Sequence, residues 1–251
     1  LEEDTRIPID KTKFGNRVLI VKEFGRGVEY SRLMKELMAF NVENQFQKKL
    51  KDQMKRVLDT RAAQAFQHTD VKVVFSPTSL TGGTWSTNGT PGATAIAPFT
   101  FDHCTAIVDY MRDTIHVPPY AGDHYIGLSC NRNMRSLKQD RNFTQWAMYA
   151  GKVDFIYVGE QLKTEGIRWV EVNRSEAFAN LAGNSSVLGE AVVFGDEAVA
   201  MIEVVTPHLL LDSNFQNDFN RKQAAAWYGL LAMGAVWDSA DDGKAKIIRV
   251  D

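Results

Sequence analysis

The sequence predicts an α+β fold, in which helices and strands share one chain without regular alternation. Residues 31–68 have the pattern of one long amphipathic helix, and the remaining segments interleave short strands with short helices in no βαβ rhythm. At 251 residues the chain can hold one large domain or two modest ones. We therefore expect one long structural helix attached to a mixed body.

The long helix is predicted from apolar residues that recur at steps of four. The stripe consists of Leu33, Met34, Leu37, Met38, Val42, Phe46, Leu50, Met54, Val57, Leu58, Ala62 and Phe66. Ser31 suits an N-cap, and neither Gly nor Pro interrupts the segment before the strand-like residues 71–75. A coiled coil or one arm of a helical bundle is the alternative. It is disfavoured because no second helix of similar length is present and the step of four drifts from a heptad.

Residues 1–30 are predicted to form an extended two-stranded ribbon. Its strands are expected at residues 6–9 and 17–24, and Gly25 and Gly27 then provide a flexible pivot. An isolated ribbon of two strands is at best marginally stable in water. We therefore expect the rest of the subunit, or a neighbouring molecule, to cover it.

The remaining elements are short. Residues 76–98 are rich in Ser, Thr, Gly and Pro and are read as an excursion of a sheet or a contact surface. Strands are predicted at 71–75, 125–130, 154–158, 167–172, 191–194 and 245–250, and helices at 101–115, 134–150 and 219–234. In the last of these helices, Trp227 is expected to pack in the core.

Charge and composition describe an ordinary globular chain. The formal net charge is −2, so nothing global favours nucleic acid, but residues 31–68 carry a local excess of +4. Such a face suits a polyanion, although charged helical faces are more often simply solvated. No apolar run reaches eighteen residues, so no membrane partner is expected, and two cysteines are too few for a disulfide framework. The chain begins at Leu1 without a signal-peptide pattern, which leaves a processed product, an engineered form and a fragment open.

The sequence offers no catalytic fingerprint. It lacks the phosphate-binding loop, the dinucleotide-binding glycines, the nucleophile elbow, the zinc-protease helix and any Cys-x-x-Cys pair. His103 and Cys104 are adjacent, so their side chains diverge on a helix and do not form a catalytic pair. We therefore assign no catalytic, cofactor-binding or metal-ligating residue and expect no cofactor.

Three weaker groupings have simpler explanations. Asp109 and Asp113 lie four residues apart and are read as solvated helix charges. An acidic segment resembles half a calcium loop without its terminal Glu, and it is read as a surface turn formed by Asp238, Asp241, Asp242 and Gly243. An enzyme site built from residues distant in the sequence, such as His124 and Asp140, stays a minor alternative.

The order of a ribbon, a solitary long helix and a mixed body resembles the major capsid protein of tailed double-stranded DNA bacteriophages, which has the Hong Kong 97 fold. Later segments extend the resemblance. Gly159–Glu160 with Gly166–Asn173 resembles the stretch where such proteins return from the apical domain. Two further segments are similar to coat proteins typified by phage N-four, namely Gly189–Gly195 with Ala198 and Asn217–Arg221 leading to Ala226–Gly229, and the closing Lys246–Val250 fits the terminal strand of that family. One departure is that this family usually has an amino-terminal segment before its extended loop, whereas this chain starts almost in that loop.

The resemblance implies a domain plan. It assigns residues 1–30 to an extended loop, residues 31–100 to a peripheral domain with a spine helix at 31–68, residues 101–150 to an axial domain, and residues 151–251 to a return through both domains. Exposed strands and apolar stripes of such a plan can be buried on identical neighbours.

The resemblance also implies a structural and not an enzymatic role. The expected function is a subunit of an icosahedral viral capsid, which assembles into hexamers and pentamers around double-stranded DNA and contacts that DNA weakly and without sequence preference. Portal, scaffolding and decoration proteins are further expected partners. The expected location is the virion, after assembly in the host cytoplasm. The alternative is an encapsulin-like nanocompartment that encloses protein cargo.

Overall fold

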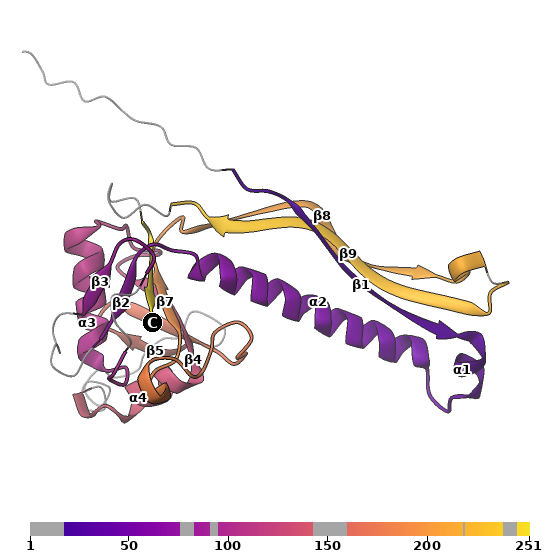
Figure 1. The fold of residues 1–251 in the computed structure, drawn as a ribbon, viewed down its shortest axis with the longest axis horizontal. Helices are drawn as coiled ribbons and strands as arrows, with labels where there is room; N and C mark the ends of the chain where they lie inside the picture. Colours follow the sequence, from indigo (N-terminus) through magenta and orange to yellow (C-terminus); the bar gives the residue numbers. More distant parts are fainter. Residues whose placement is uncertain (1–17, 76–82, 91–94, 143–159, 218, 238–244) are drawn as a thin grey trace, which may run out of the picture.

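The computed structural model describes residues 18–75, 83–90, 95–142, 160–217, 219–237 and 245–251. These residues form a body and a long arm that projects from one side of it (Figure 1). The body is built on a seven-stranded mixed sheet, and the arm combines a three-stranded antiparallel sheet with one long helix. This architecture confirms the predicted α+β class.

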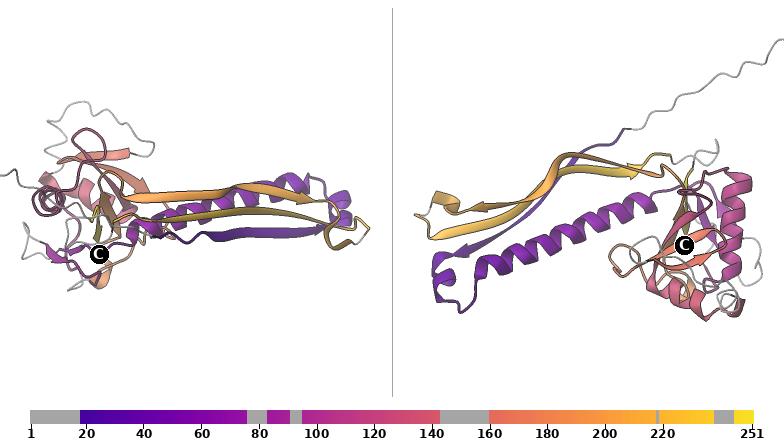
Figure 2. Two further views of the ribbon diagram at one scale, coloured as in Figure 1. Left: turned by 90° about the horizontal axis from the view of Figure 1, so that it is seen from above. Right: turned by 180° about the vertical axis from the view of Figure 1, so that it is seen from behind.

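The arm consists of three strands and two helices. In sheet order the strands are β1 (Lys22–Ser31), β9 (Lys222–Ala235) and β8 (Val199–Asp212), and both pairs are antiparallel. The short helix α1 (Arg32–Leu37) lies at the far end, and α2 (Val42–Gln67) returns along the sheet toward the body (Figures 1 and 2). The arm is therefore two layers thick.

One face of the arm sheet packs on α2. Leu50 is 2% exposed and shares a buried cluster with Tyr30 of β1 and with Ala225 and Trp227 of β9. Partly buried Phe24, Val28, Met34, Phe46, Met54, Val57 and Leu209 surround this cluster. The predicted apolar stripe of the helix is thus confirmed over its central turns, where a sheet takes the place of a partner helix.

The predicted single helix over residues 31–68 is wrong at its start, because the helix is interrupted between α1, which ends at Leu37, and α2, which begins at Val42. Ser31 caps α1 as expected, since its Oγ accepts a hydrogen bond from the Met34 amide at 3.1 Å. Met38 is already extended (φ −77°, ψ 136°), and Asn41 caps α2 by accepting from the Asn44 amide at 3.1 Å. Neither Gly nor Pro marks the break, and the capping asparagine was the signal that could have predicted it.

Glu43 holds the corner that this break creates. Its carboxylate accepts hydrogen bonds from Lys35 of α1 at 2.8 Å and from the Tyr30 hydroxyl of β1 at 3.1 Å. Burial, and then the hydrogen bond to Glu43, raise the pKa of Tyr30 to about 12. Three elements are therefore connected through one carboxylate at the far end of the arm.

The predicted helix over residues 219–234 is also wrong, because Lys222–Ala235 is the central strand β9. Ala225, Trp227, Gly229 and Leu231 are buried at alternate positions, which is the period of a strand. Alanine and leucine favour helix in isolation, but hydrogen bonding to strands on both sides overrides that weak preference. Trp227 is buried as predicted, at 2% exposure, although it lies in a strand.

The ribbon prediction is corrected where the structure describes it. The strand expected at residues 17–24 instead runs from Lys22 to Ser31, so Gly25 and Gly27 lie inside β1 and do not form a pivot. At Gly25 a Cβ atom would lie 2.9 Å from the Trp227 carbonyl oxygen, so glycine allows close approach of β1 to β9. The strands predicted at residues 6–9 and 154–158 lie outside the described residues.

The body sheet mixes parallel and antiparallel pairs in the order β3-β2-β10-β7-β4-β6-β5. Its strands are β2 (Lys72–Val74), β3 (Thr84–Ser86), β4 (Tyr125–Cys130), β5 (Glu160–Thr164), β6 (Ile167–Val172), β7 (Ala191–Phe194) and β10 (Ile247–Val250). The strands predicted at 125–130, 167–172 and 191–194 are confirmed at those bounds. Those predicted at 71–75 and 245–250 are confirmed with shorter bounds.

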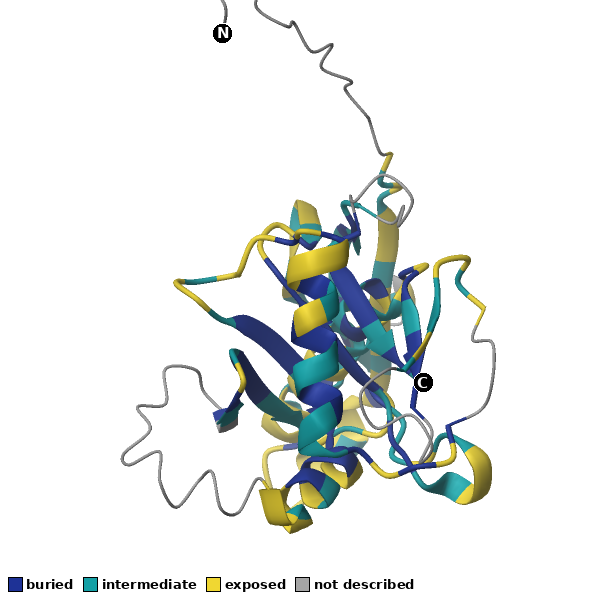
Figure 3. Ribbon diagram, turned by 90° about the vertical axis from the view of Figure 1, so that its left-hand side faces the viewer, coloured by how far each residue is buried: buried dark blue, intermediate teal, exposed yellow. Residues whose placement is uncertain are grey.

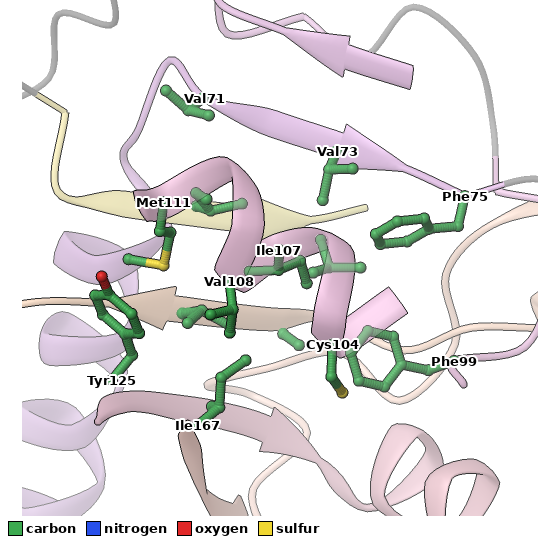
Figure 4. Packing of buried hydrophobic residues seen from close by; sticks show 14 of the residues in the cluster. Val71, Val73, Phe75, Phe99, Cys104, Ile107, Val108, Met111, Tyr125 and Ile167 are labelled. Carbon is green, nitrogen blue, oxygen red and sulfur yellow. The ribbon is translucent and has the colours of Figure 1, made fainter. Parts of the chain in front are cut away.

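Helix α3 (Phe101–Asp109) covers one face of this sheet and continues into a π-helical turn, Tyr110–Thr114 (Figure 3). Its buried side chains contact residues from several strands in the main core, part of which is shown in Figure 4. This core includes Val71, Val73, Phe75, Cys104, Ile107, Val108, Met111, Tyr125, Ile167 and Trp169. Gly127 faces Trp169 across the β4–β6 pair, where any Cβ atom would overlap the indole ring. The helix predicted at 134–150 is wrong at both described bounds, because α4 (Asn131–Gln139) begins earlier and ends at Gln139, where Asp140 is extended (φ −66°, ψ 129°). Residues 143–150 of that prediction lie outside the described residues.

The last turns of α2 pack against the other face of the body sheet. Ala63 and Phe66 join a second core with Ile126, Val192 and Phe194, and the rings of Phe66 and Phe194 have centroids 4.6 Å apart. The Gln67 amide also donates hydrogen bonds to the Glu190 carboxylate at 2.8 Å and to the Ala177 carbonyl at 3.0 Å. Helix α2 therefore belongs to the arm over most of its length and to the body over its last turns.

Replacing Leu50 with aspartate should unfold the arm. The carboxylate would lie unpaired between α2 and the sheet, which costs several kcal/mol. Thermal melting followed by circular dichroism should show a large drop in Tm. Lys49→Asp, which places the same carboxylate on the exposed side of the helix, is the control and should change Tm little. An unchanged Tm for Leu50→Asp would contradict this assignment of the buried face.

Trp227→Ala should destabilise the subunit by about 3–5 kcal/mol, as truncations of large buried side chains do. Tyr228→Ala is the matched control because Tyr228 is the next residue of β9, lies on the other face of the sheet and is only partly buried. Urea denaturation followed by tryptophan fluorescence and circular dichroism measures both losses. Similar losses in the two variants would contradict the strand geometry of β9.

Candidate functional site

The structure buries the two residues that sequence analysis considered as a nucleophile–base pair. Cys104 is fully buried in the main core, and that burial raises the pKa of its thiol to about 12. The His103 ring stacks on Phe75 with centroids 4.0 Å apart, and its Nδ1 accepts a hydrogen bond from the Thr100 amide at 3.2 Å. Each side chain has a packing role, and a protonated thiol inside a core is a poor nucleophile.

The other weak groupings do not form a site in the described part of the chain. Asp109 and Asp113 are both exposed. His124 has Arg168, Lys163, Glu160 and Asp123 as its charged neighbours, whereas Asp140 accepts a hydrogen bond from the Phe101 amide at 2.8 Å. His124 and Asp140 are therefore not brought together, and the acidic segment at residues 238–243 lies outside the described residues.

A charged cluster lies beside His124 in the body. Arg168 and Glu160 form a buried ion pair at 2.9 Å between neighbouring strands β6 and β5. Burial, and then the nearby Arg168 and Lys163 cations, lower the pKa of His124. No group of His, Cys, Asp and Glu suited to a metal ion occurs among the described residues. No described helix is long and apolar enough to cross a membrane.

The surfaces with unusual chemistry lie on the arm. Its far end, which we call the tip surface, exposes large apolar side chains from α1, the α1–α2 corner, the end of β8 and the β8–β9 turn: Leu33, Leu37, Met38, Phe40, Leu210, Leu211 and Phe219. The Arg32 amide donates to the Arg221 carbonyl at 2.8 Å, which places α1 against that turn. Leu33, Leu37 and Met38 belong to the stripe that the sequence predicts to be buried, but the helix is interrupted before Asn41 and all three are exposed to solvent.

The arm sheet has a second uncovered region along β8. Met201, Ile202 and Val204 are exposed on this strand, and neither β1 nor β8 has a second strand partner among the described residues. Unpaired edges and exposed apolar side chains favour contact with another chain. The arm is thus the part of the subunit best suited to protein–protein contact.

A basic face lies on α2. Lys48, Lys49, Lys51, Lys55 and Arg56 are all exposed, and Leu50 within the same segment faces the sheet. We call these five side chains the basic face. Together with Asp52, they give the segment from Lys48 to Arg56 a net charge of +4, which equals the positive excess over residues 31–68.

Comparisons with known proteins identify this architecture. No protein-family model matches the sequence, and no curated protein matches it. Solved capsids do match: that of cyanophage Pam1 with a TM-score of 0.64 and 14% identity over 99% of this chain and 81% of that chain. The capsid of Helicobacter pylori bacteriophage KHP30 matches with a TM-score of 0.66 and 12% identity over 92% and 75%. The capsid of Ralstonia phage GP4 matches with a TM-score of 0.63 and 12% identity, over 96% of this chain and 79% of that chain.

The matches confirm the fold that the resemblance implied. Arm and body together follow the fold of tailed-phage capsid proteins, the Hong Kong 97 type, over nearly the whole chain. At 11–14% identity the likeness is one of fold, so the function is argued from the surfaces described above.

Lowering the pH should destabilise the body through His103. Burial lowers the pKa of His103 from its ordinary value of 6.5 to about 4. Below pH 6.5 the unfolded chain therefore binds a proton that the folded chain does not, and stability falls by about 1.4 kcal/mol per pH unit down to about pH 4.

Urea denaturation of the wild type and of His103→Gln between pH 7 and pH 4.5 measures this loss. The variant is less stable at pH 7 but lacks the titrating ring, so the difference between the two proteins should shrink as the pH falls. Two parallel stability curves would contradict a neutral, buried His103.

Proposed function

We propose that this chain is the structural subunit of an icosahedral bacteriophage capsid and that it has no enzymatic role. The observation that carries the proposal is the fold match, which includes the projecting arm as well as the body and covers 99% of the chain in one capsid structure. A projecting arm that exposes seven large apolar side chains at its tip is unfavourable for a monomer in water. It is expected where neighbouring copies cover it.

The exposed surfaces support assembly from identical copies. The tip surface and the uncovered β8 edge lie on an arm that α2 and β9 make rigid, so both can be presented to a neighbour at fixed geometry. Burial of such apolar side chains contributes about 25 cal/mol per Å². In this proposal the copies form hexamers and pentamers, and the closed shell surrounds double-stranded DNA.

The finer assignments belong to the same proposal. Residues 1–30 form the extended loop, 31–100 the peripheral domain, 101–150 the axial domain and 151–251 the return. The contacts of Lys22–Ser31 along β9 support joining the end of that loop to the peripheral sheet. Similarity to coat proteins typified by phage N-four rests on the segments named above. Portal, scaffolding and decoration proteins are further proposed partners, and the location is the virion after assembly in the host cytoplasm.

An encapsulin-like nanocompartment is the second candidate function, because it uses the same fold and would expose the same arm. The two candidates differ in what the shell contains. Nucleic acid inside purified particles supports the capsid, and a protein cargo on the inner wall supports the compartment.

Assembly of the purified chain tests the proposal. Negative-stain microscopy and sedimentation velocity, across a range of salt, crowding agent and added scaffold, should show closed particles or their hexameric and pentameric precursors. Absorbance at 260 and 280 nm, together with mass spectrometry of particles from infected cells, identifies their contents. Monomers under every condition would count strongly against the proposal.

Charges placed on the tip surface should block assembly without unfolding the subunit. Leu37 is 75% exposed and Phe40 is 54% exposed, so Leu37→Glu with Phe40→Glu leaves the subunit core intact. Introduced carboxylates would have to be desolvated at an apolar contact between copies. Tm should therefore change little while sedimentation shows loss of particles.

The matched control is Leu37→Met with Phe40→Leu, which keeps the tip surface apolar and should assemble. Normal particles from the glutamate variant would show that the tip surface makes no essential contact. A large drop in Tm would show that it belongs to the fold of the subunit.

A further inference from the structure

The basic face of α2 concentrates positive charge on a chain whose net charge is −2. Between Lys48 and Arg56 the helix carries five cations and one acid, Asp52, all of them exposed. The local net charge is therefore +4 over nine residues. Such a density is not required by the helix itself, because like charges three and four residues apart repel each other.

Within the described part of the chain, these cations have no acidic partner. The next acid along the helix, Asp59, is already paired with Arg174 at 2.7 Å. Lys35, by contrast, is paired with Glu43 at 2.8 Å. The positive charge of the basic face is therefore available to a partner.

The helix orders these cations in a row. Lys48, Lys51 and Lys55 are separated by three and four residues, so they follow one side of α2, and Lys49 and Arg56 flank that row. The eight-residue step from Lys48 to Arg56 spans about 12 Å along the axis. Leu50 packs against the sheet on the opposite side, and Figure 2 shows α2 covered by the sheet on that side.

The chemistry of this face distinguishes a polyanion from a protein partner. From Val42 to Gln67 no large apolar side chain is exposed, although the tip surface of the same arm exposes seven. The centre of a protein–protein interface is depleted in charged residues and enriched in apolar and aromatic ones. Binding to a phosphate backbone needs only cations that release condensed counterions. A row of lysines without apolar neighbours fits the second case.

We propose that the basic face of α2 binds the phosphate backbone of duplex DNA without sequence preference. The inference rests on the proposed capsid function and assigns the DNA contact to one surface. Duplex DNA carries one negative charge per about 1.7 Å of axis, so the basic face, which extends about 12 Å from Lys48 to Arg56, lies opposite several phosphates at once. The subunit then orients with α2 toward the DNA and with the uncovered face of the β1-β9-β8 sheet away from it.

The test compares two triple variants of the full chain that lose the same charge. One is Lys48→Gln, Lys51→Gln, Lys55→Gln on the basic face. The control is Arg132→Gln, Arg135→Gln, Arg141→Gln, which removes three exposed cations from and beside α4 on the body. Fluorescence anisotropy measures binding of unassembled subunits to two 30-base-pair duplexes of unrelated sequence at several NaCl concentrations.

The basic-face variant should bind both duplexes at least about tenfold more weakly, and its slope of log K against log salt should become shallower by about 2 to 3. The α4 control should bind within about twofold of the wild type. Wild-type affinity in the basic-face variant, or an equal loss in the control, would overturn the assignment. Tighter binding of the wild type to polyglutamate than to DNA would also overturn it, in favour of an acidic protein.

Particle formation by the same variants separates this inference from the proposed function. A basic-face variant that forms normal particles and still binds DNA like the wild type contradicts only the inference. A wild-type chain that never assembles contradicts the capsid function, whatever its affinity for DNA. Circular dichroism melting shows that both variants are folded, as expected for glutamine at exposed positions in or next to helices.

Discussion

The packing of α2 on the three-stranded sheet is the contact on which the rest of the structure depends. Leu50, Tyr30, Ala225 and Trp227 form its buried centre, and β9, which contributes Ala225 and Trp227, lies far from β1 and α2 in the sequence. The same helix continues into the body, where Phe66 packs against Phe194. Because one rigid helix joins both cores, the arm is held at a fixed position relative to the body, and its surfaces can meet the same partner in every copy.

A two-layer arm necessarily leaves two outer surfaces. The sheet covers only one side of α2, which leaves the lysine row from Lys48 to Lys55 in solvent, and α2 covers only one face of the sheet. At the far end there is no further layer to bury the apolar side chains of α1 and the corner, such as Leu37 and Phe40. The protein–protein and nucleic-acid surfaces proposed for this chain therefore follow from the thinness of the arm and not from a pocket.

The body illustrates why shifted pKa values do not by themselves identify a catalytic site. Burial alone accounts for the direction of the shifts at His103 and Cys104, and it favours the neutral form of each. Shifted groups mark function when they converge in a cleft with a charge partner. His103 and Cys104 instead lie on the buried side of α3, and the Phe75 ring stacks on the imidazole of His103. Their shifted pKa values therefore affect the stability of the fold.

The sequence by itself determined the fold class, the buried stripe of α2 and the local positive charge of that helix, because each depends on residue type at a fixed local period. It also determined the strands at residues 125–130, 167–172 and 191–194, whose apolar residues are too short a run for a helix. Only the tertiary structure decided that residues 222–235 form a strand. The helix preference of alanine is weak, and hydrogen bonding to β1 and β8 on either side overrides it. The tertiary structure also decided that the helix is interrupted at Met38. The Asn41 cap and the contacts of Glu43 with Tyr30 and Lys35 stabilise the interrupted form more than the apolar pattern favours a continuous helix. That break turns three apolar residues of the predicted stripe into the exposed tip surface.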